Sequence, residues 1–147
     1  MHTVAQILQG KPDQAVYTLA PTVSAHEAVR LMVDKNIGAL VIVEGGRVVG
    51  LFSERDCVRK LVLTARPAPQ TRLGELMDSP VMYVRPDQTS DECMALMTQH
   101  RLRHLPVLDA GGQLIGLVSI GDLVKATIAD HQFIIEQLEH YISGERH

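Results

Sequence analysis

Apolar and polar residues follow the same succession of patterns twice along the chain. After Ser24 and again after Thr89, apolar residues recur every three or four positions, which predicts an amphipathic helix with the Ser or Thr as its N-cap. Two short runs rich in β-branched residues follow each helix, and a glycine turn between them predicts a β-hairpin. With a short extended entry before each helix and a further helix after each hairpin, each half is predicted to fold as a βαββα unit. The predicted strands are 16–19, 39–43, 48–52, 81–84, 105–108 and 114–118.

The two halves are copies of one another. Pro21 and Pro86 stand 65 positions apart, and this separation holds as far as the hairpin turn. It then becomes 66, because the second turn contains one extra residue, and turns are where structural copies tolerate insertions. The matched pairs are Glu27/Glu92, Leu31/Leu96, Met32/Met97, Leu40/Leu105, Gly50/Gly116, Leu51/Leu117, Ser53/Ser119 and Asp56/Asp122.

Both copies share a Gly-Leu-x-Ser-x-x-Asp motif between the hairpin and the helix that follows it, at 50–56 and 116–122. One explanation is a helix capping box, in which the serine and the acidic residue satisfy free N–H groups at the start of the helix. The other is a ligand site, because a helix N-terminus attracts phosphate and a carboxylate can accept hydrogen bonds from two hydroxyls of a sugar. The motif by itself leaves both explanations open.

These residues resemble the CBS-domain pair, or Bateman module, and the chain is similar to its free-standing members. The second copy has both features that the family carries, a hydrophobic-Pro-Val step at 105–107 and the Gly-to-Asp step at 116–122. The first copy keeps the Ser-x-x-Asp step but has Leu40-Val41-Ile42 in place of Leu-Pro-Val. The resemblance implies an α/β fold in which the two repeats pack sheet to sheet about a pseudo-twofold axis and leave two clefts.

The resemblance also implies a role for individual residues. Asp56 and Asp122 would hold the ribose hydroxyls of an adenine nucleotide, and Ser53 and Ser119 would meet its phosphate. The backbone at the start of the second strand of each repeat would contact the adenine edge. The complete set of predicted ligand-binding residues is Ile37, Gly38, Ala39, Ser53, Arg55, Asp56, Arg103, His104, Leu105, Pro106, Ser119, Gly121 and Asp122.

Basic residues distinguish the two motifs. The first contains Arg55, with Arg59 and Lys60 one turn later, whereas the second contains Ile120 and Gly121 at the inner positions. Arg101, Arg103 and His104 precede the second Leu-Pro-Val step, and we expect them to reach phosphate in either cleft if the copies face each other. Alternatively, Arg55 and Arg59 are solvated helix charges. The sequence thus predicts clefts of unequal affinity, or one ligand that spans both.

Composition narrows the classes of function. The 147 residues are 46% apolar but only 3% aromatic, which fits a layered α/β core of aliphatic side chains. A net charge of −3 without a basic run argues against nucleic-acid binding. No apolar run reaches the length of a membrane span and no secretion signal is evident, so we expect a cytoplasmic protein that does not bind membranes.

The reactive side chains do not form a recognisable catalytic or metal-binding pattern. Cys57 and Cys93 are single cysteines inside predicted helices, and a strand start at His104 separates it from the helical face of His100. No nucleophile stands beside a base. We therefore expect no metal, no required cofactor and no enzymatic activity.

The predicted domains are 8–66 and 78–135, with a C-terminal helical extension at 136–147. Apolar residues recur at three-and-four spacing from Val124 to Ile142, which predicts that the last helix packs either on its own domain or on a partner. The sequence-based hypothesis is a regulatory sensor of an adenine nucleotide, with AMP favoured and NAD, ATP or ADP as alternatives, and with a homodimer expected. The other hypotheses are a protein-interaction adaptor with vestigial clefts, and a detached regulatory subunit of an enzyme or transporter. The ligand, the number of occupied clefts and the regulated target are not determined by the sequence.

Overall fold

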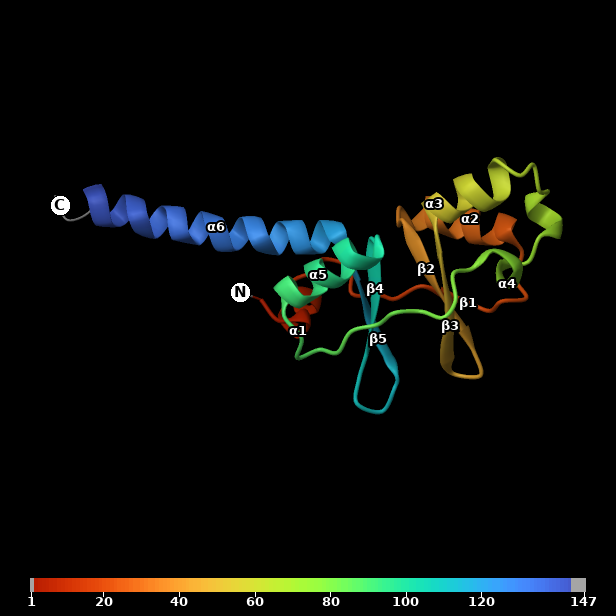
Figure 1. Ribbon diagram of the computed structural model, residues 1–147, viewed down its shortest axis with the longest axis horizontal. Coiled ribbons are helices and arrows are strands. Elements are labelled where there is room, and N and C mark those ends of the chain that lie inside the picture. The colour runs from red at the N-terminus through yellow and green to blue at the C-terminus, as the bar shows by residue number, and fades with distance from the viewer. Residues whose placement is uncertain (1, 144–147) are drawn as a thin grey trace.

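The computed structural model describes residues 2–143, with side chains described through Leu138. Two small β-sheets stand next to each other in the middle of the molecule, and most of the helices lie on their outer sides (Figure 1). The predicted mixed α/β architecture of two similar units is confirmed. The elements of the first half are α1 (Val4–Gln9), β1 (Thr18–Leu19), α2 (Ala25–Lys35), β2 (Ala39–Glu44), β3 (Arg47–Ser53), α3 (Glu54–Asp56) and a π-helical turn, η1 (Cys57–Val62). Those of the second half are a 3-10 turn, η2 (Ala68–Gln70), α4 (Leu73–Leu76), α5 (Ser90–His100), β4 (His104–Leu108), β5 (Leu114–Ser119) and α6 (Ile120–Ser143).

The two sheets repeat one pairing pattern. In the first, β2 and β3 form an antiparallel hairpin in which Ala39 faces Ser53, and β1 adds in parallel to β2. In the second, β4 and β5 pair in the same way, with His104 facing Ser119. The predicted strand at 81–84 shortens to a single parallel bridge between Val84 and Val107. The pattern of the sequence therefore gives both hairpins, while the outer strand is nearly lost in the second copy.

The two long helices of the repeats begin and end in the same way. The hydroxyls of Ser24 and Thr89 each accept a hydrogen bond from the backbone N–H three residues later, at 3.2 Å. At the other end, Asn36 and Arg101 adopt left-handed backbone angles, with φ of 54° and 56°. Hydroxyl N-caps and a left-handed C-terminal residue satisfy backbone groups that the helix leaves free. The predicted helix starts are confirmed at both caps.

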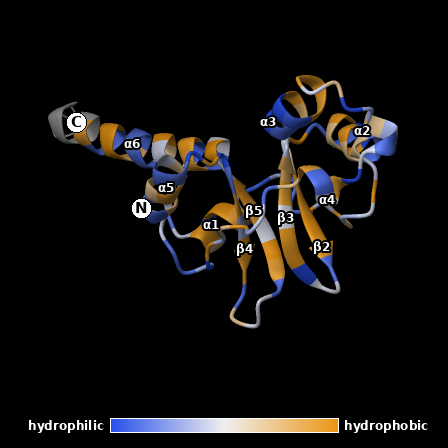
Figure 2. Ribbon diagram, turned by 45° about the vertical axis from the view of Figure 1, so that its right-hand side comes forward, coloured by the Kyte–Doolittle hydropathy of each residue, from blue (hydrophilic) through white to orange (hydrophobic). Residues whose placement is uncertain are grey.

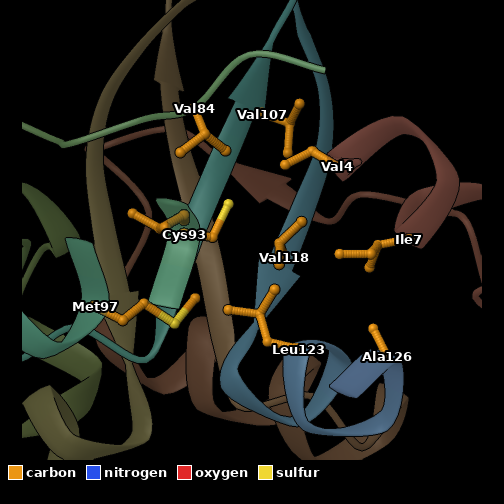
Figure 3. Packing of buried hydrophobic residues seen from close by; sticks show 10 residues of the cluster. Val4, Ile7, Val84, Cys93, Met97, Val107, Val118, Leu123 and Ala126 are labelled. Atoms are coloured by element: carbon orange, nitrogen blue, oxygen red, sulfur yellow. The ribbon is translucent and has the colours of Figure 1, made fainter. Parts of the chain in front are cut away.

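Each repeat is completed by a short helix from outside its own βαββα segment: α1, at the start of the chain, completes the second repeat, and α4, which follows the first repeat, completes the first. Val4 and Ile7 of α1 are buried in the core of the second repeat, where they pack with residues of α5, β4, β5 and α6 (Figure 3). Leu73 and Leu76 of α4 are buried in the core of the first repeat. The predicted ranges 8–66 and 78–135 leave out most of α1 and all of α4. The chain therefore passes from the second core to the first after α1, and from the first core to the second after α4.

Helix α6 extends well beyond the body of the molecule (Figure 1). Its first turns pack in the core through Leu123 and Ala126, and its outer part alternates apolar and polar residues (Figure 2). The predicted extension at 136–147 continues this helix without a break as far as Ser143, while residues 144–147 lie outside the described part of the chain. Within the described residues, no helix is both long enough and apolar enough to cross a membrane.

Candidate nucleotide site

The Ser-x-x-Asp motif of the first repeat joins β3 to α3. The backbone N–H of Ser53 donates to Oδ2 of Asp56 at 2.9 Å, and the N–H of Asp56 donates to Oγ of Ser53 at 3.2 Å. These reciprocal bonds are those of a capping box. The capping explanation of the motif is therefore correct in the first repeat.

The second motif has the same geometry. The N–H of Ser119 donates to Oδ2 of Asp122 at 2.8 Å, and the N–H of Asp122 donates to Oγ of Ser119 at 3.1 Å. In both repeats the cap uses Oδ2 and leaves the second carboxylate oxygen outside it. A carboxylate has about four lone-pair sites, so capping does not exhaust its capacity to accept hydrogen bonds. The cap fixes each carboxylate in place, which is also what a ligand site requires.

A further backbone bond ties each motif to the loop that enters the hairpin. The N–H of Glu54 donates to the carbonyl of Gly38 at 3.0 Å, and the N–H of Ile120 donates to the carbonyl of Arg103 at 2.8 Å. The motif and the loop are thus held next to each other in both repeats, although the bonded residues are 16 and 17 positions apart in the chain.

A cavity with a volume of about 540 Å³ lies at the first motif. This volume lies within the range of small-molecule sites, roughly 300–1,000 Å³. Both repeats contribute to its walls, the first through α3, η1 and their surroundings and the second through the loop before β4. The residues that line it are Gly38, Leu51, Ser53, Glu54, Arg55, Asp56, Val58, Arg59, Lys60, Asp78, Arg101, Leu102, Arg103 and His104.

The wall of this cavity is positively charged, in contrast to the chain as a whole. It contains four arginines and Lys60 against three carboxylates, whereas the chain has a net charge of −3. Among the described residues, none of the four guanidinium groups forms an ion pair. Arginines that converge on a cavity without carboxylate partners can bind phosphate through charge-assisted hydrogen bonds. The geometry therefore favours an anionic ligand. The arginines are Arg55, Arg59, Arg101 and Arg103.

Asp56 is the buried acid of this cavity, with 6% of its surface exposed. Burial raises the pKa of its carboxyl above the ordinary value, and the charge of Asp78 adds to this effect, while the hydrogen bond from Ser53 and the charge of Lys60 oppose it. Lys60 Nζ lies 3.5 Å from Oδ1 of Asp56 but 2.6 Å from Oδ1 of Asp78. Although desolvation opposes it, the pKa of Lys60 is raised by these two carboxylates. Lys60 is thus held mainly by Asp78, at the margin of the cavity.

His104 stands where the two repeats meet. A Cβ atom at Gly38 would lie 3.5 Å from Nε2 of His104 and 2.9 Å from Oε1 of Glu54, so the glycine allows these side chains of both repeats to approach closely. Burial lowers the pKa of His104 to about 4, although the charge of Asp122 acts in the opposite direction. The imidazole is therefore neutral near pH 7, and the arginines supply the positive charge of this wall.

The second motif is covered by the N-terminal segment. Lys11 Nζ donates to Oδ2 of Asp122 at 2.9 Å and to the carbonyl of Leu117 at 2.8 Å. Leu8 lies against Gly116, where a Cβ atom would be 2.6 Å from its Cδ1. The space between this segment and the residues Gly116 and Leu117 is about 100 Å³. The two motifs therefore share their internal geometry and differ in what faces them.

A comparison with known families decides what this repeated arrangement is. A family model described as the CBS domain matches the chain twice, over residues 4–63 and 73–129. The chain belongs to the CBS-domain family. The two matches include α1 and α4, the helices that complete the opposite core, and together they span most of the chain. The predicted family, and the fold that it implies, are confirmed.

Relatives and solved structures extend the family match. The mitochondrial CBS domain-containing protein CBSX3 of Arabidopsis thaliana is 36% identical over 126 residues, and the aligned region covers 82% of this chain and 61% of that protein. A solved CBS-domain protein of Burkholderia ambifaria is 54% identical with a TM-score of 0.84, covering 88% of this chain and 96% of that one. CBSX2, solved in complex with AMP, is 26% identical with a TM-score of 0.72, covering 89% and 99%.

The structure brings only part of the predicted CBS site together. Six of the thirteen predicted residues line the large cavity, and they come from both repeats. The others lie elsewhere: Leu105 and Pro106 are buried in β4, and Ser119 and Asp122 form the cap of the covered second cleft. The six are Gly38, Ser53, Arg55, Asp56, Arg103 and His104.

Several residues around the CBS motifs were absent from the predicted set. Lys60 could have been included, because it stands four positions after Asp56 on a predicted helix. Asp78 and Lys11 carry no such signal, since their partners are 18 and 111 positions away in the chain. Among the described residues, no group of three or more His, Cys, Asp or Glu side chains has an arrangement that could hold a metal ion. Burial raises the pKa of the thiols of both Cys57 and Cys93, which disfavours the reactive thiolate.

Proposed function

We propose that this chain is a regulatory sensor that binds an adenine nucleotide of the AMP class in the cavity at its first CBS motif, without catalysing a reaction. The observation that carries the proposal is the cavity of about 540 Å³ in which a buried, capped carboxylate faces a set of arginines without carboxylate partners. In this arrangement Asp56 accepts hydrogen bonds from the ribose hydroxyls, and the arginines of both repeats bind the phosphate.

Two further observations support an AMP-sized ligand. CBSX2, which has the same fold over nearly its whole length, was solved in complex with AMP. In addition, the arginines from the loop before β4 belong to the second repeat, while Ser53 and Asp56 belong to the first. A phosphate between them would link the two repeats, and a ligand that binds one arrangement of the repeats more tightly shifts the population toward it. Nucleotide occupancy would thereby reach the surface that a regulated partner contacts.

The test is calorimetric titration with AMP, adenosine, NAD, ADP and ATP. Because charge-assisted hydrogen bonds contribute about 1.5–3 kcal/mol each, AMP should bind at least about tenfold more tightly than adenosine. The double variant Arg55→Gln/Arg103→Gln should lose this preference for AMP over adenosine. Arg47→Gln is the matched control, since Arg47 is an exposed arginine of β3 that does not line the cavity.

Asp56→Asn tests the ribose contact separately. An asparagine retains an oxygen that can accept the N–H of Ser53, so the helix cap can persist while the charge is lost. This variant should weaken both AMP and adenosine by at least about tenfold. An unchanged affinity for the nucleotide panel in Asp56→Asn/Asp122→Asn would reject the sensor proposal. In that case the adaptor hypothesis, with motifs that serve only as helix caps, would remain.

The exposed apolar side chains of α6 favour a protein partner for this helix, and we expect a homodimer. Val124, Ile128, Ile135 and Leu138 follow three-and-four spacing, interrupted at His131, on a helix that extends beyond the body of the molecule. Light scattering should give the mass of a dimer for the wild-type chain and of a monomer for Ile128→Glu/Ile135→Glu. A monomer in both would contradict this assembly and leave the nucleotide proposal intact.

A further inference from the structure

Lys11 makes contacts that set the second CBS motif apart from the first. It follows α1, and its Nζ donates to Oδ2 of Asp122 at 2.9 Å and to the carbonyl of Leu117 at 2.8 Å. The side chains of Lys11 and Asp122 are only 26% and 14% exposed. An ammonium group has three donors, and two of them are engaged here by acceptors of the motif region. The N-terminal segment is thus anchored directly on the acid that the resemblance assigns to ribose.

A second, independent contact holds the same segment in the cleft. Leu8 lies over Gly116 of β5, so closely that a Cβ atom at position 116 would be 2.6 Å from Cδ1 of Leu8. Seven residues between positions 8 and 16 line the space next to Gly116 and Leu117, which is about 100 Å³. An AMP-sized ligand needs a pocket of several hundred Å³. The space at this end of the second motif is therefore too small for a nucleotide as long as the segment stays in place.

The lysine of the first motif is arranged differently. Lys60 lies 3.5 Å from the carboxylate of Asp56 but 2.6 Å from Asp78, and it stands on the margin of a cavity of about 540 Å³. Asp78 thus draws Lys60 away from the motif acid. Among the described residues, Lys11 has no such second carboxylate, and Asp122 is its ion-pair partner.

We infer that Lys11 is a specificity-determining residue that competes with the nucleotide for Asp122 and restricts binding to the first motif. This inference rests on the proposed function of the first motif. The ammonium group offers the carboxylate a charged donor where a ribose would offer two hydroxyls, so both cannot occupy Asp122 in the same way. Displacement of residues 8–16 opens the second site, and the wild-type chain binds one nucleotide.

The experiment is calorimetric titration of AMP into the wild-type chain, Lys11→Ala, Lys11→Ala/Asp122→Asn and the control Arg47→Gln, which also removes one positive charge. Arg47 is an exposed residue of β3 that lines neither the large cavity nor the space at Gly116. The wild type and the control should bind one AMP per chain. Lys11→Ala should bind two AMP molecules per chain, or should bind the second one at least about tenfold more tightly than the wild type does. Lys11→Ala/Asp122→Asn should again bind one.

The outcomes separate this inference from the proposed function. One AMP per chain in both the wild type and Lys11→Ala would overturn the inference and leave the first site standing. Weaker AMP binding in Lys11→Ala would also overturn it, because Lys11 would then be a ligand-binding residue. If no variant binds AMP, both proposals fail.

Amine labelling followed by mass spectrometry provides a test that requires no nucleotide and no folding change. In the wild type, Lys11 should react with an amine-specific reagent at least about tenfold more slowly than the exposed Lys35 of α2, because the Nζ of Lys11 is engaged in hydrogen bonds within a part-buried site. Asp122→Asn should raise the rate at Lys11 and leave that at Lys35 unchanged. Equal rates at both lysines in the wild type would show that the segment does not cover the cleft.

Discussion

The two CBS motifs have nearly identical internal hydrogen bonds but different surroundings. Each serine and aspartate exchange the same pair of hydrogen bonds, with all four distances between 2.8 and 3.2 Å. Around the first, an open cavity collects arginines from both repeats, whereas the second is covered by Leu8 and Lys11 of the N-terminal segment. Ligand access is therefore decided by what packs against a motif and not by the motif itself.

The difference follows from the path of the chain between the repeats. The first motif is followed by α4 and Asp78, and the backbone of Asp78 pairs with Leu51 in β3 through two hydrogen bonds. The second motif receives α1 and the residues after it, whose lysine side chain reaches the motif acid. The two helices occupy corresponding places in the two cores, but the segments attached to them carry different side chains. Duplicated repeats can thus acquire separate roles without any change in the shared motif.

The largest expected effect concerns the helices that cross between the cores. Ile7→Ala and Leu73→Ala should each cost about 2–5 kcal/mol of the free energy of unfolding, because each leaves a cavity among buried side chains. Hydrogen exchange should show the loss of protection in β4 and β5 for Ile7→Ala, and in β2 and β3 for Leu73→Ala. Loss of protection in β2 and β3 for Ile7→Ala, or in β4 and β5 for Leu73→Ala, would contradict the crossed arrangement of the cores.

His104 should add a loss of stability in acid to the second repeat that has no counterpart at the matching position of the first, which is Ala39. The pKa of His104 is about 4 in the folded chain against 6.5 for an exposed histidine, so the folded state binds fewer protons. The stabilisation is complete above pH 6.5 and is lost as the pH falls toward 4, by up to about 3 kcal/mol.

His104→Ala provides the measurement. Urea unfolding of the wild type and the variant at several values between pH 6.5 and 4 should show the larger loss in the wild type, since all other titrating groups are shared. Parallel curves for the two proteins would show that His104 does not supply this pH dependence.

Substitution of the glycine at the start of each motif tests whether the side chains that cover them, Met77 and Leu8, are equally rigid. An added methyl group at Gly50 meets Met77, and one at Gly116 meets Leu8. Gly50→Ala and Gly116→Ala should each destabilise the chain by about 1–3 kcal/mol, as expected for overpacking. Thermal or urea unfolding measures the loss of stability. Met77→Ala should restore part of the stability of Gly50→Ala only, and Leu8→Ala part of the stability of Gly116→Ala only. Rescue across the repeats would mean that the covering segments are not independent.

The smallest expected effect is the loss of a serine cap, and it should be the same in both repeats. Ser53→Ala and Ser119→Ala each remove a hydroxyl that accepts a backbone hydrogen bond, at 3.2 and 3.1 Å, and should cost about 1 kcal/mol. Equal losses in urea unfolding would confirm that the caps are equivalent. A clearly larger loss at Ser119 would indicate that the cap and the Lys11 contact are coupled.

Much of the fold could be predicted because it depends on local pattern. The helix caps at Ser24 and Thr89 and both hairpins are set by residues within a few positions of each other. Where an element depended on remote packing, the prediction was less accurate. The second copy retains only the bridge between Val84 and Val107 in place of its first strand.

The sequence by itself determined the duplication, the family and the repeated Ser-x-x-Asp motif with its basic neighbours. Tertiary structure alone decided which side chains face each motif acid, because Lys11 reaches Asp122 across 111 positions and Lys60 reaches Asp78 across 18. It also decided at which motif the arginines of the second repeat gather, where the sequence had left either cleft open. Such contacts depend on where distant segments come together after the cores have packed, and no spacing between neighbouring residues encodes that position.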